Sequence, residues 1–225
     1  FCNGRPDWDK LGVAFVNNVH PYELAKIRLL NVVHSALAYP ALLMGLEFVH
    51  EAATSPIIRP FIENLMSDEI APTLHKIEGF DYDTYGHTIL DRFANTAIAD
   101  RLERICSDGS QKLSNQLYPI INERMERGES FRRLSFTVAA WLRYLVGRTE
   151  ASKEYKVIDP IADKLTHAVA RYGEDVAQYI EDRDFFPVSL TSNPDFSHEI
   201  SFWLTMLYHR GVETAIKQLE EGLGV

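Results

Sequence analysis

The stretch from residue 22 to residue 39 constrains the fold most, because apolar side chains occupy nearly every side of the helix that it would form. At 100° per residue, Leu30, Val33 and Leu37 lie at about 40°, −20° and 20° from Lys26. Further apolar residues cover the remaining sides: Ile27, Leu29, Val32, Ala36 and Ala38. A helix that is apolar all round lies inside its domain. The sequence therefore predicts a helical domain built around this segment.

The rest of the chain also carries helical patterning. His20-Pro21 opens the first helix, since proline at the first helical position gives up no hydrogen bond, and Pro40 predicts its end near Tyr39. Glycines separate the other predicted helices, which span residues 42–53, 56–77, 82–93, 97–106, 114–127, 131–146, 158–172, 174–182, 196–209 and 212–221. One short strand is expected over residues 13–19. The predicted fold is all-α, a single helical domain over residues 1–225 with at most one or two short strands.

Charge and composition exclude several classes of protein. The chain of 225 residues has a formal net charge of −9 and no run of basic residues, which argues against a nucleic-acid partner. Its longest uncharged stretch, Leu29 to Leu46, is interrupted by polar residues, so no membrane span is expected. The two cysteines, Cys2 and Cys106, cannot form a disulfide framework, which favours a reducing, cytoplasmic location.

Three polar residues stand on one broad side of the apolar helix. Lys26, Asn31 and His34 lie at about 0°, 140° and 80°, over an axial length of about 12 Å. Burial lowers the pKa of a lysine, which makes it a usable proton acceptor near neutral pH. Asparagine can donate to an oxygen that carries negative charge, and histidine can orient a hydroxyl. However, a core histidine, a lysine that reaches water and an asparagine bound to a carbonyl would fit the same spacing, so spacing alone leaves the function open.

Two blocks of sequence resemble one known family. The run PYELAKIRLLNVVHS (residues 21–35) is similar to the long-chain mannitol dehydrogenases, whose Lys-x4-Asn-x2-His signature falls on Lys26, Asn31 and His34. GRP at residues 4–6 and VHEA at residues 49–52 look like the C-terminal domain of that family. The second block, RFANTAIAD at residues 92–100, leads to Arg104 and Lys112; Thr96 stands where the family often has proline. The resemblance covers residues 1–150 well and the remainder more loosely.

The resemblance implies an activity and a role for each of five residues. Members of the family transfer a hydride between C2 of an open-chain sugar alcohol, ketose or hexuronate and NAD or NADP, without a metal. Lys26 would be the general acid and base, Asn31 would stabilise charge on the reacting oxygen, and His34 would hold that oxygen or its neighbour. Arg104 and Lys112 would bind other hydroxyls of the substrate. The implied fold is the helical half of a two-domain dehydrogenase, similar to the C-terminal domain of 6-phosphogluconate dehydrogenase.

The sequence contains no metal motif and no dinucleotide motif. No His-Glu-x-x-His occurs, and neither cysteine has a second cysteine at ligand spacing. No G-x-G-x-x-G turn occurs either, so we expect the cofactor to be bound mainly by an N-terminal Rossmann domain that this chain lacks. The start at Phe1, without an initiator methionine, agrees with a cut through a longer protein. No residue of this chain is assigned to cofactor binding, and the choice between NAD and NADP stays open.

Two other functions remain compatible with these patterns. One is a non-catalytic helical scaffold or binding domain that descended from such an enzyme, against which the retained Lys26, Asn31 and His34 argue. The other is the helical half of a different dehydrogenase, such as 6-phosphogluconate dehydrogenase, which would need a basic clamp for a phosphate. The upstream gene sequence and a substrate panel distinguish these from a polyol dehydrogenase.

Overall fold

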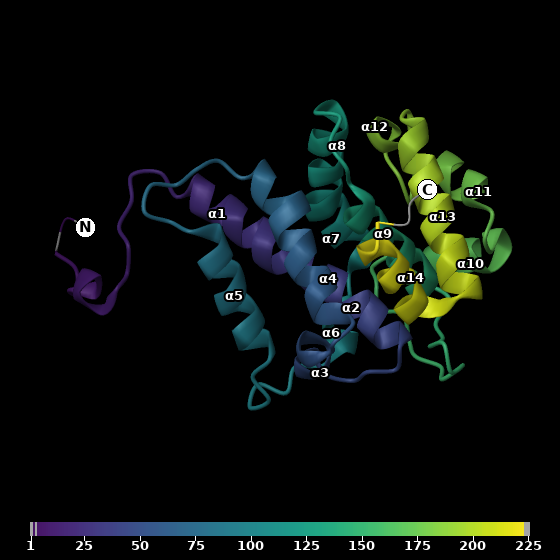
Figure 1. Cartoon of the computed structure of the whole chain (residues 1–225), viewed down its shortest axis with the longest axis horizontal. Helices are drawn as coiled ribbons and strands as arrows, with labels where there is room; N and C mark the ends of the chain where they lie inside the picture. Colours follow the sequence, from purple (N-terminus) through teal and green to yellow (C-terminus); the bar gives the residue numbers. More distant parts are fainter. Residues whose placement is uncertain (1, 3, 223–225) are drawn as a thin grey trace.

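The computed structural model describes Cys2 and residues 4–222, and helices form its body (Figure 1). The elements in chain order are η1 (Trp8–Leu11), α1 (His20–Lys26), η2 (Ile27–Val32), α2 (Val33–Leu43), α3 (Val49–Thr54), α4 (Ile58–Asn64), η3 (Leu65–Ile70), η4 (Ala71–Thr73), α5 (Tyr82–Phe93), α6 (Leu102–Cys106), α7 (Gly109–Lys112), η5 (Leu113–Leu117), α8 (Tyr118–Glu126), α9 (Arg132–Tyr144), α10 (Ala162–Tyr172), α11 (Val176–Glu181), α12 (Val188–Thr191), α13 (Pro194–His209) and α14 (Gly211–Glu220). The part of the chain that is described contains two isolated antiparallel bridges but no strand. The predicted all-α fold is confirmed.

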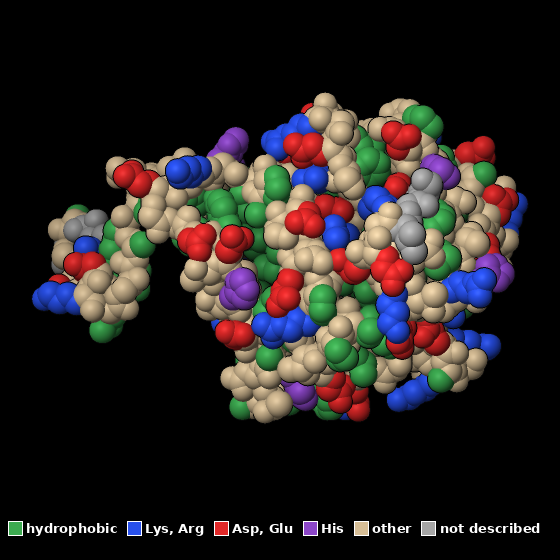
Figure 2. All heavy atoms as spheres, in the orientation of Figure 1, with side chains coloured by type: hydrophobic (Ala, Val, Ile, Leu, Met, Phe, Trp, Pro, Cys, Tyr) green, Lys and Arg blue, Asp and Glu red, His purple; other side chains and the backbone are tan. Residues whose placement is uncertain are grey.

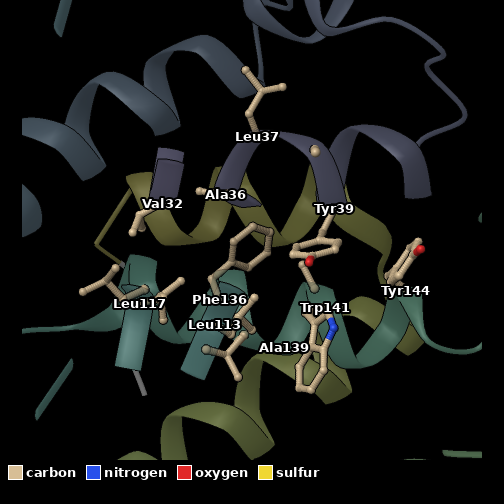
Figure 3. Close-up of a cluster of buried hydrophobic side chains, with 14 of the residues drawn as sticks. Val32, Ala36, Leu37, Tyr39, Leu113, Leu117, Phe136, Ala139, Trp141 and Tyr144 are labelled. Atoms are coloured by element: carbon tan, nitrogen blue, oxygen red, sulfur yellow. The ribbon is translucent and has the colours of Figure 1, made fainter. Parts of the chain in front are cut away.

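The central helix is the one that the sequence predicts. α1, η2 and α2 follow one another without a break, and the middle stretch, η2, is π-helical. Every residue of α2 except His34 is buried. Tyr39 lies over Trp141 of α9, and Val32 lies beside Leu117 of η5 (Figure 3). Neighbouring helices thus cover this helix on several sides, as its apolar pattern requires.

The predicted end of the central helix at Tyr39 is wrong. The helix continues through Pro40 to Leu43, although proline supplies no N–H for the carbonyl of the preceding turn. The residues that follow, Ala41 and Leu43, are fully buried, and their packing outweighs the missing hydrogen bond. The helix ends at Leu43, with Met44 as its C-cap, and Gly45 follows with a φ of +89° that suits glycine. That break also divides the predicted helix 42–53, so that α3 is a separate element.

The predicted strand over residues 13–19 is also wrong. The segment has no regular structure, and all its residues are exposed, with Val19 at 66%. A strand needs a partner for its backbone hydrogen bonds, and the described residues contain no strand that could supply one. In Figure 1 this segment, at the N-terminal end, stands away from the helical body.

The structure contains a helix in each of the other predicted segments, but most of these helices begin or end at other residues than predicted. α5 spans the predicted residues, while the helix predicted over 56–77 ends at Thr73 and the one over 97–106 begins at Leu102. The helix predicted from residue 114 begins earlier, at Gly109, because α7, η5 and α8 are continuous. The short helices η1 and α12 are absent from the sequence-based assignment.

Helix α9 lies between the central helix and α13. It packs against α2 on one side and against α13 on the other. The buried carboxylate of Glu69 caps its N-terminus by accepting the backbone N–H groups of Arg133 and Leu134, at 2.8 and 3.0 Å. Phe136 meets Trp203 of α13 edge to face, with ring centroids 5.8 Å apart. α2, which packs against α9, carries part of the site described next.

Candidate active site

Four of the five predicted site residues meet at one cavity. Asn31, His34, Arg104 and Lys112 line a cavity of about 250 Å³, together with Leu30, Ser35, Ile105 and Gln116. They come from three places in the chain: the central helix, α6 and α7. The sequence predicted each of them separately, and the fold brings them together. The cavity therefore offers several hydrogen-bond donors to one small polar molecule.

The turn between α6 and α7 sets the position of Lys112. Asp108 adopts a left-handed conformation with φ of +56°, and its N–H donates to the carbonyl of Ile158 at 2.9 Å. Asp159 accepts from the backbone N–H and the hydroxyl of Ser110, at 2.9 and 2.7 Å, and so holds the start of α7. Such a cap fixes the first turn of a helix. Lys112 lies at the end of that turn.

Lys112 is held in the wall of the cavity. Its Nζ donates to the backbone carbonyl of Ile105 at 2.9 Å, and its side chain is partly buried. Burial lowers the pKa of Lys112 below its usual value. Lys112 therefore presents a cation whose position is determined by the backbone of α6.

His34 lies in the middle of the site, with its ring stacked on Phe93 at a centroid distance of 4.2 Å. Burial lowers the pKa of His34 from 6.5 to about 4; Asp100 opposes this shift, while the positive charges of Arg104, Lys112 and Lys26 add to it. The imidazole is therefore neutral at neutral pH, with one nitrogen that donates and one that accepts. A neutral imidazole suits the binding of a hydroxyl, which both donates and accepts.

In an NMR titration, we expect the ring signals of His34 to shift with a midpoint near pH 4, well below the ordinary histidine pKa of 6.5. Because the folded pKa is the lower one, the unfolded chain takes up the proton first as pH falls. His34 should therefore lower the free energy of unfolding as pH drops from 6.5 toward 4. His34→Asn should remove this share of the acid sensitivity. A titration midpoint near 6.5 for His34 would contradict the burial described here.

Lys26 does not line this cavity. Its side chain is exposed on α1, whereas the apolar pattern had led us to expect a desolvated lysine. The described residues thus provide no cover over Lys26. Its charge still acts on His34, where it helps to lower the imidazole pKa. Any desolvation of Lys26 has to come from atoms outside the described residues.

Asp100 is a polar residue of the site to which the sequence analysis gave no role. Its carboxylate accepts from Arg104, with Nε and Oδ1 2.7 Å apart and a second bond between Nη2 and Oδ2. This pairing lowers the pKa of Asp100 and raises that of Arg104. The only sequence signal was its position as the last residue of the block at 92–100.

A second, more apolar cavity of about 180 Å³ lies on the Asp100 side of His34. It shares Leu30 and His34 with the first cavity and is otherwise lined by Val49, His50, Arg92, Phe93, Asn95, Ile98 and Asp100. His34 and Leu30 therefore stand between the two hollows.

Among the residues that the structure describes, no three His, Cys, Asp or Glu side chains gather as ligands of a metal ion would. No helix in this described part of the chain has the length and apolar character that crossing a membrane requires. Figure 2 shows acidic and basic side chains interspersed on the face in view.

Comparison with known proteins identifies the family. The model of the mannitol dehydrogenase C-terminal domain matches residues 18–208. A mannitol 2-dehydrogenase of Aspergillus fumigatus is 36% identical over 94% of this chain and 43% of its own length. The Pseudomonas fluorescens mannitol 2-dehydrogenase, solved as a ternary complex with NAD and D-mannitol, superposes with a TM-score of 0.90 and 36% identity, over 97% of this chain and 44% of that one.

A second solved structure has the same fold. A substrate-free D-sorbitol dehydrogenase superposes with a TM-score of 0.85 and 25% identity, over 95% of this chain and 44% of that one. This chain thus spans less than half the length of the relatives that it matches. It aligns with them over nearly its whole length and shares their helical fold. The chain belongs to the mannitol dehydrogenase C-terminal domain family.

Proposed function

We propose that this chain is the substrate-binding and catalytic half of an NAD-dependent enzyme that interconverts an open-chain sugar alcohol and a ketose. The observation that carries the proposal is the convergence of Asn31, His34, Arg104 and Lys112 on one polar cavity. The similarity to a mannitol 2-dehydrogenase that binds NAD and D-mannitol supports the class of substrate. The same hydride transfer could also act on a hexuronate, or use NADP in place of NAD.

Each polar residue of the cavity binds a different part of an open-chain polyol. The Asn31 amide donates to the reacting oxygen and stabilises the negative charge that develops there. Neutral His34 orients that oxygen or the neighbouring hydroxyl. Arg104 and Lys112 donate to hydroxyls further along the chain. Together they fix the reacting carbon in one orientation.

Lys26 takes the proton from the alcohol during oxidation and returns it to the carbonyl oxygen during reduction. Its exposed position in this chain fits this role only if the other half of the protein covers α1 and excludes water. The resemblance to the Lys-x4-Asn-x2-His signature supports the assignment. In that signature the lysine, here Lys26, stands five residues before the asparagine, Asn31.

The cofactor belongs to the other half of the protein. Dinucleotides are held where a glycine-rich turn joins a strand to a helix, and the described residues contain no strand. We therefore infer an N-terminal half that binds NAD, which the greater length of the relatives supports. When bound, NAD supplies the acceptor for the hydride of the reacting carbon. No metal takes part in the proposed mechanism.

A substrate panel with the full-length protein tests the proposal. NADH should form with D-mannitol or another open-chain polyol and should be consumed with the corresponding ketose; a hexuronate reductase would instead consume NADH with a keto-hexuronate. Turnover of 6-phosphogluconate alone would assign the chain to another dehydrogenase. No turnover with any of these compounds would favour the scaffold alternative.

Arg104→Ala and Lys112→Ala in the full-length enzyme should each raise KM for the polyol by about tenfold and leave kcat nearly unchanged. Each loses a charged donor that acts equally on bound substrate and transition state. Steady-state kinetics measure the split between the two constants. Arg101→Ala is the matched control, because Arg101 pairs with Glu47 at 2.6 Å outside the cavity. A collapse of kcat at constant KM would mean that the removed residue takes part in the chemistry.

A further inference from the structure

The carboxylate of Asp100 grips Arg104 with both of its oxygens. Arg104 Nε donates to Oδ1 at 2.7 Å, and Nη2 donates to Oδ2. Paired parallel bonds of this kind fix the plane of a guanidinium as well as its distance. The Asp100 side chain is 22% exposed, whereas that of Arg104 is 67% exposed. Asp100 is therefore the more buried partner of the pair.

The backbone holds Asp100 in place without help from Arg104. The carbonyl of Asp100 accepts from the N–H of Val49 at 2.9 Å, and Leu102 donates to the carbonyl of Glu47 at 2.9 Å. These bonds flank the antiparallel bridge that joins residues 48 and 101. The preceding residue, Ala99, has φ of +47°, a conformation that costs energy in any residue except glycine. Such strain persists only where the surrounding structure imposes it.

Among the described residues, Asp100 is the hydrogen-bond and ion-pair partner of the Arg104 guanidinium, and no other is found. It lies on α6, a helix of five residues, at the edge of the cavity that we assign to the substrate. Lys112, the other cation of that cavity, is held by the carbonyl of Ile105. An arginine side chain that is free to rotate has to be ordered when a ligand binds, and this weakens binding. Arg104 therefore depends on Asp100 for a fixed position.

We propose that Asp100 is a positioning residue that holds the Arg104 guanidinium at the substrate cavity, so that Arg104 binds a substrate hydroxyl without further ordering. The inference rests on the proposed function, in which Arg104 contacts the polyol. It assigns Asp100 an effect on substrate binding that is transmitted through Arg104, with no part in the proton or hydride transfer.

A double-mutant cycle in the full-length enzyme tests this inference. Asp100→Asn keeps the size of the side chain and removes the charged grip, and it should raise KM for D-mannitol about tenfold. The values of kcat and of KM for NAD should stay within about twofold of wild type. In the Arg104→Ala background, Asp100→Asn should add almost nothing, because the residue through which it acts is already missing. Glu47→Gln is the control, since it breaks the neighbouring pair with Arg101 and should leave both KM values unchanged.

Each other outcome of the cycle counts against a particular statement. If Asp100→Asn raises KM equally with and without Arg104, Asp100 does not act through Arg104, and the inference is wrong. An unchanged KM in Asp100→Asn overturns it as well. If Arg104→Ala itself leaves KM unchanged, the proposed contact between Arg104 and the polyol fails and the role of Asp100 fails with it. The substrate panel would still test the polyol dehydrogenase activity separately.

Discussion

Lys26→Ala in the full-length enzyme is expected to lower kcat for polyol oxidation by ~10²–10⁴-fold, the usual contribution of a positioned proton acceptor. Folding should survive, because the Lys26 side chain is exposed on α1. Oxidation requires the neutral amine and reduction requires the ammonium group.

The matched control is Lys164→Ala on α10. Lys164 is another exposed lysine, 64% accessible and paired with Asp184, and it should be replaceable without loss of turnover. An added small amine should restore part of the activity of Lys26→Ala by supplying the missing base from solution. If Lys26→Ala retains more than about a tenth of the wild-type rate, Lys26 is not the acid and base. Lys112, whose pKa burial lowers, would then be the lysine to test for that role.

Gly109→Ala is expected to lower the free energy of unfolding by about 3 kcal/mol, because the added methyl group has no room. A Cβ at this position would lie 2.4 Å from the indole nitrogen of Trp141 and 2.6 Å from the hydroxyl oxygen of Tyr39. Both rings are buried and rigid, so the chain around Gly109 would have to move. Because Gly109 begins α7, the same shift should displace Lys112 and raise KM for the polyol.

Gly86→Ala is the control for this packing argument. Its Cβ would meet only the flexible end of Met66, whose Cε is 2.9 Å away, and alanine is the better helix former. The change in stability there should be less than about 1 kcal/mol. Chemical denaturation of both variants gives the comparison. If Gly109→Ala is as stable as Gly86→Ala, the close packing of Trp141 and Tyr39 on α7 is wrong.

The sequence could predict most of the fold because helix formation and burial leave periodic patterns in it. Apolar side chains on nearly every side of residues 22–39 predicted the central helix. The observed ends of α5 are also the predicted ones. The predictions were wrong where contacts between distant parts of the chain determine the local structure. Burial of Ala41 and Leu43 carries the central helix past Pro40, and residues 13–19 lack the partner strand that their pattern would need.

The position of Lys26 was predicted from a regular helix, and the helix is not regular there. A π-helical turn holds more residues than an α-helical turn, so each residue advances by a smaller angle. The stretch Ile27–Val32 separates Lys26 from His34 and contains Asn31. The angles computed at 100° per residue therefore do not hold across the site. The exposure of Lys26 could not be derived either, because it depends on neighbouring elements and on the other half of the protein.

The Asp100–Arg104 pair shows a second limit of sequence reasoning. The two residues are four apart, a spacing that is common between charged neighbours on a helix. Here, however, Asp100 precedes α6 and is fixed by backbone bonds to residues 47–49, which lie far away in the sequence. Long-range contacts of this kind leave no local pattern, so the role that we propose for Asp100 could not be predicted from the sequence.

A structure of the full-length protein with NAD and D-mannitol tests the central claim most directly. The proposed function predicts mannitol in the cavity between Asn31, His34, Arg104 and Lys112. Its reacting oxygen should lie within hydrogen-bond distance of Asn31 and of Lys26, and the N-terminal half should cover Lys26. Mannitol bound elsewhere, or a ternary complex in which Lys26 stays exposed to solvent and remote from the sugar alcohol, would contradict the account.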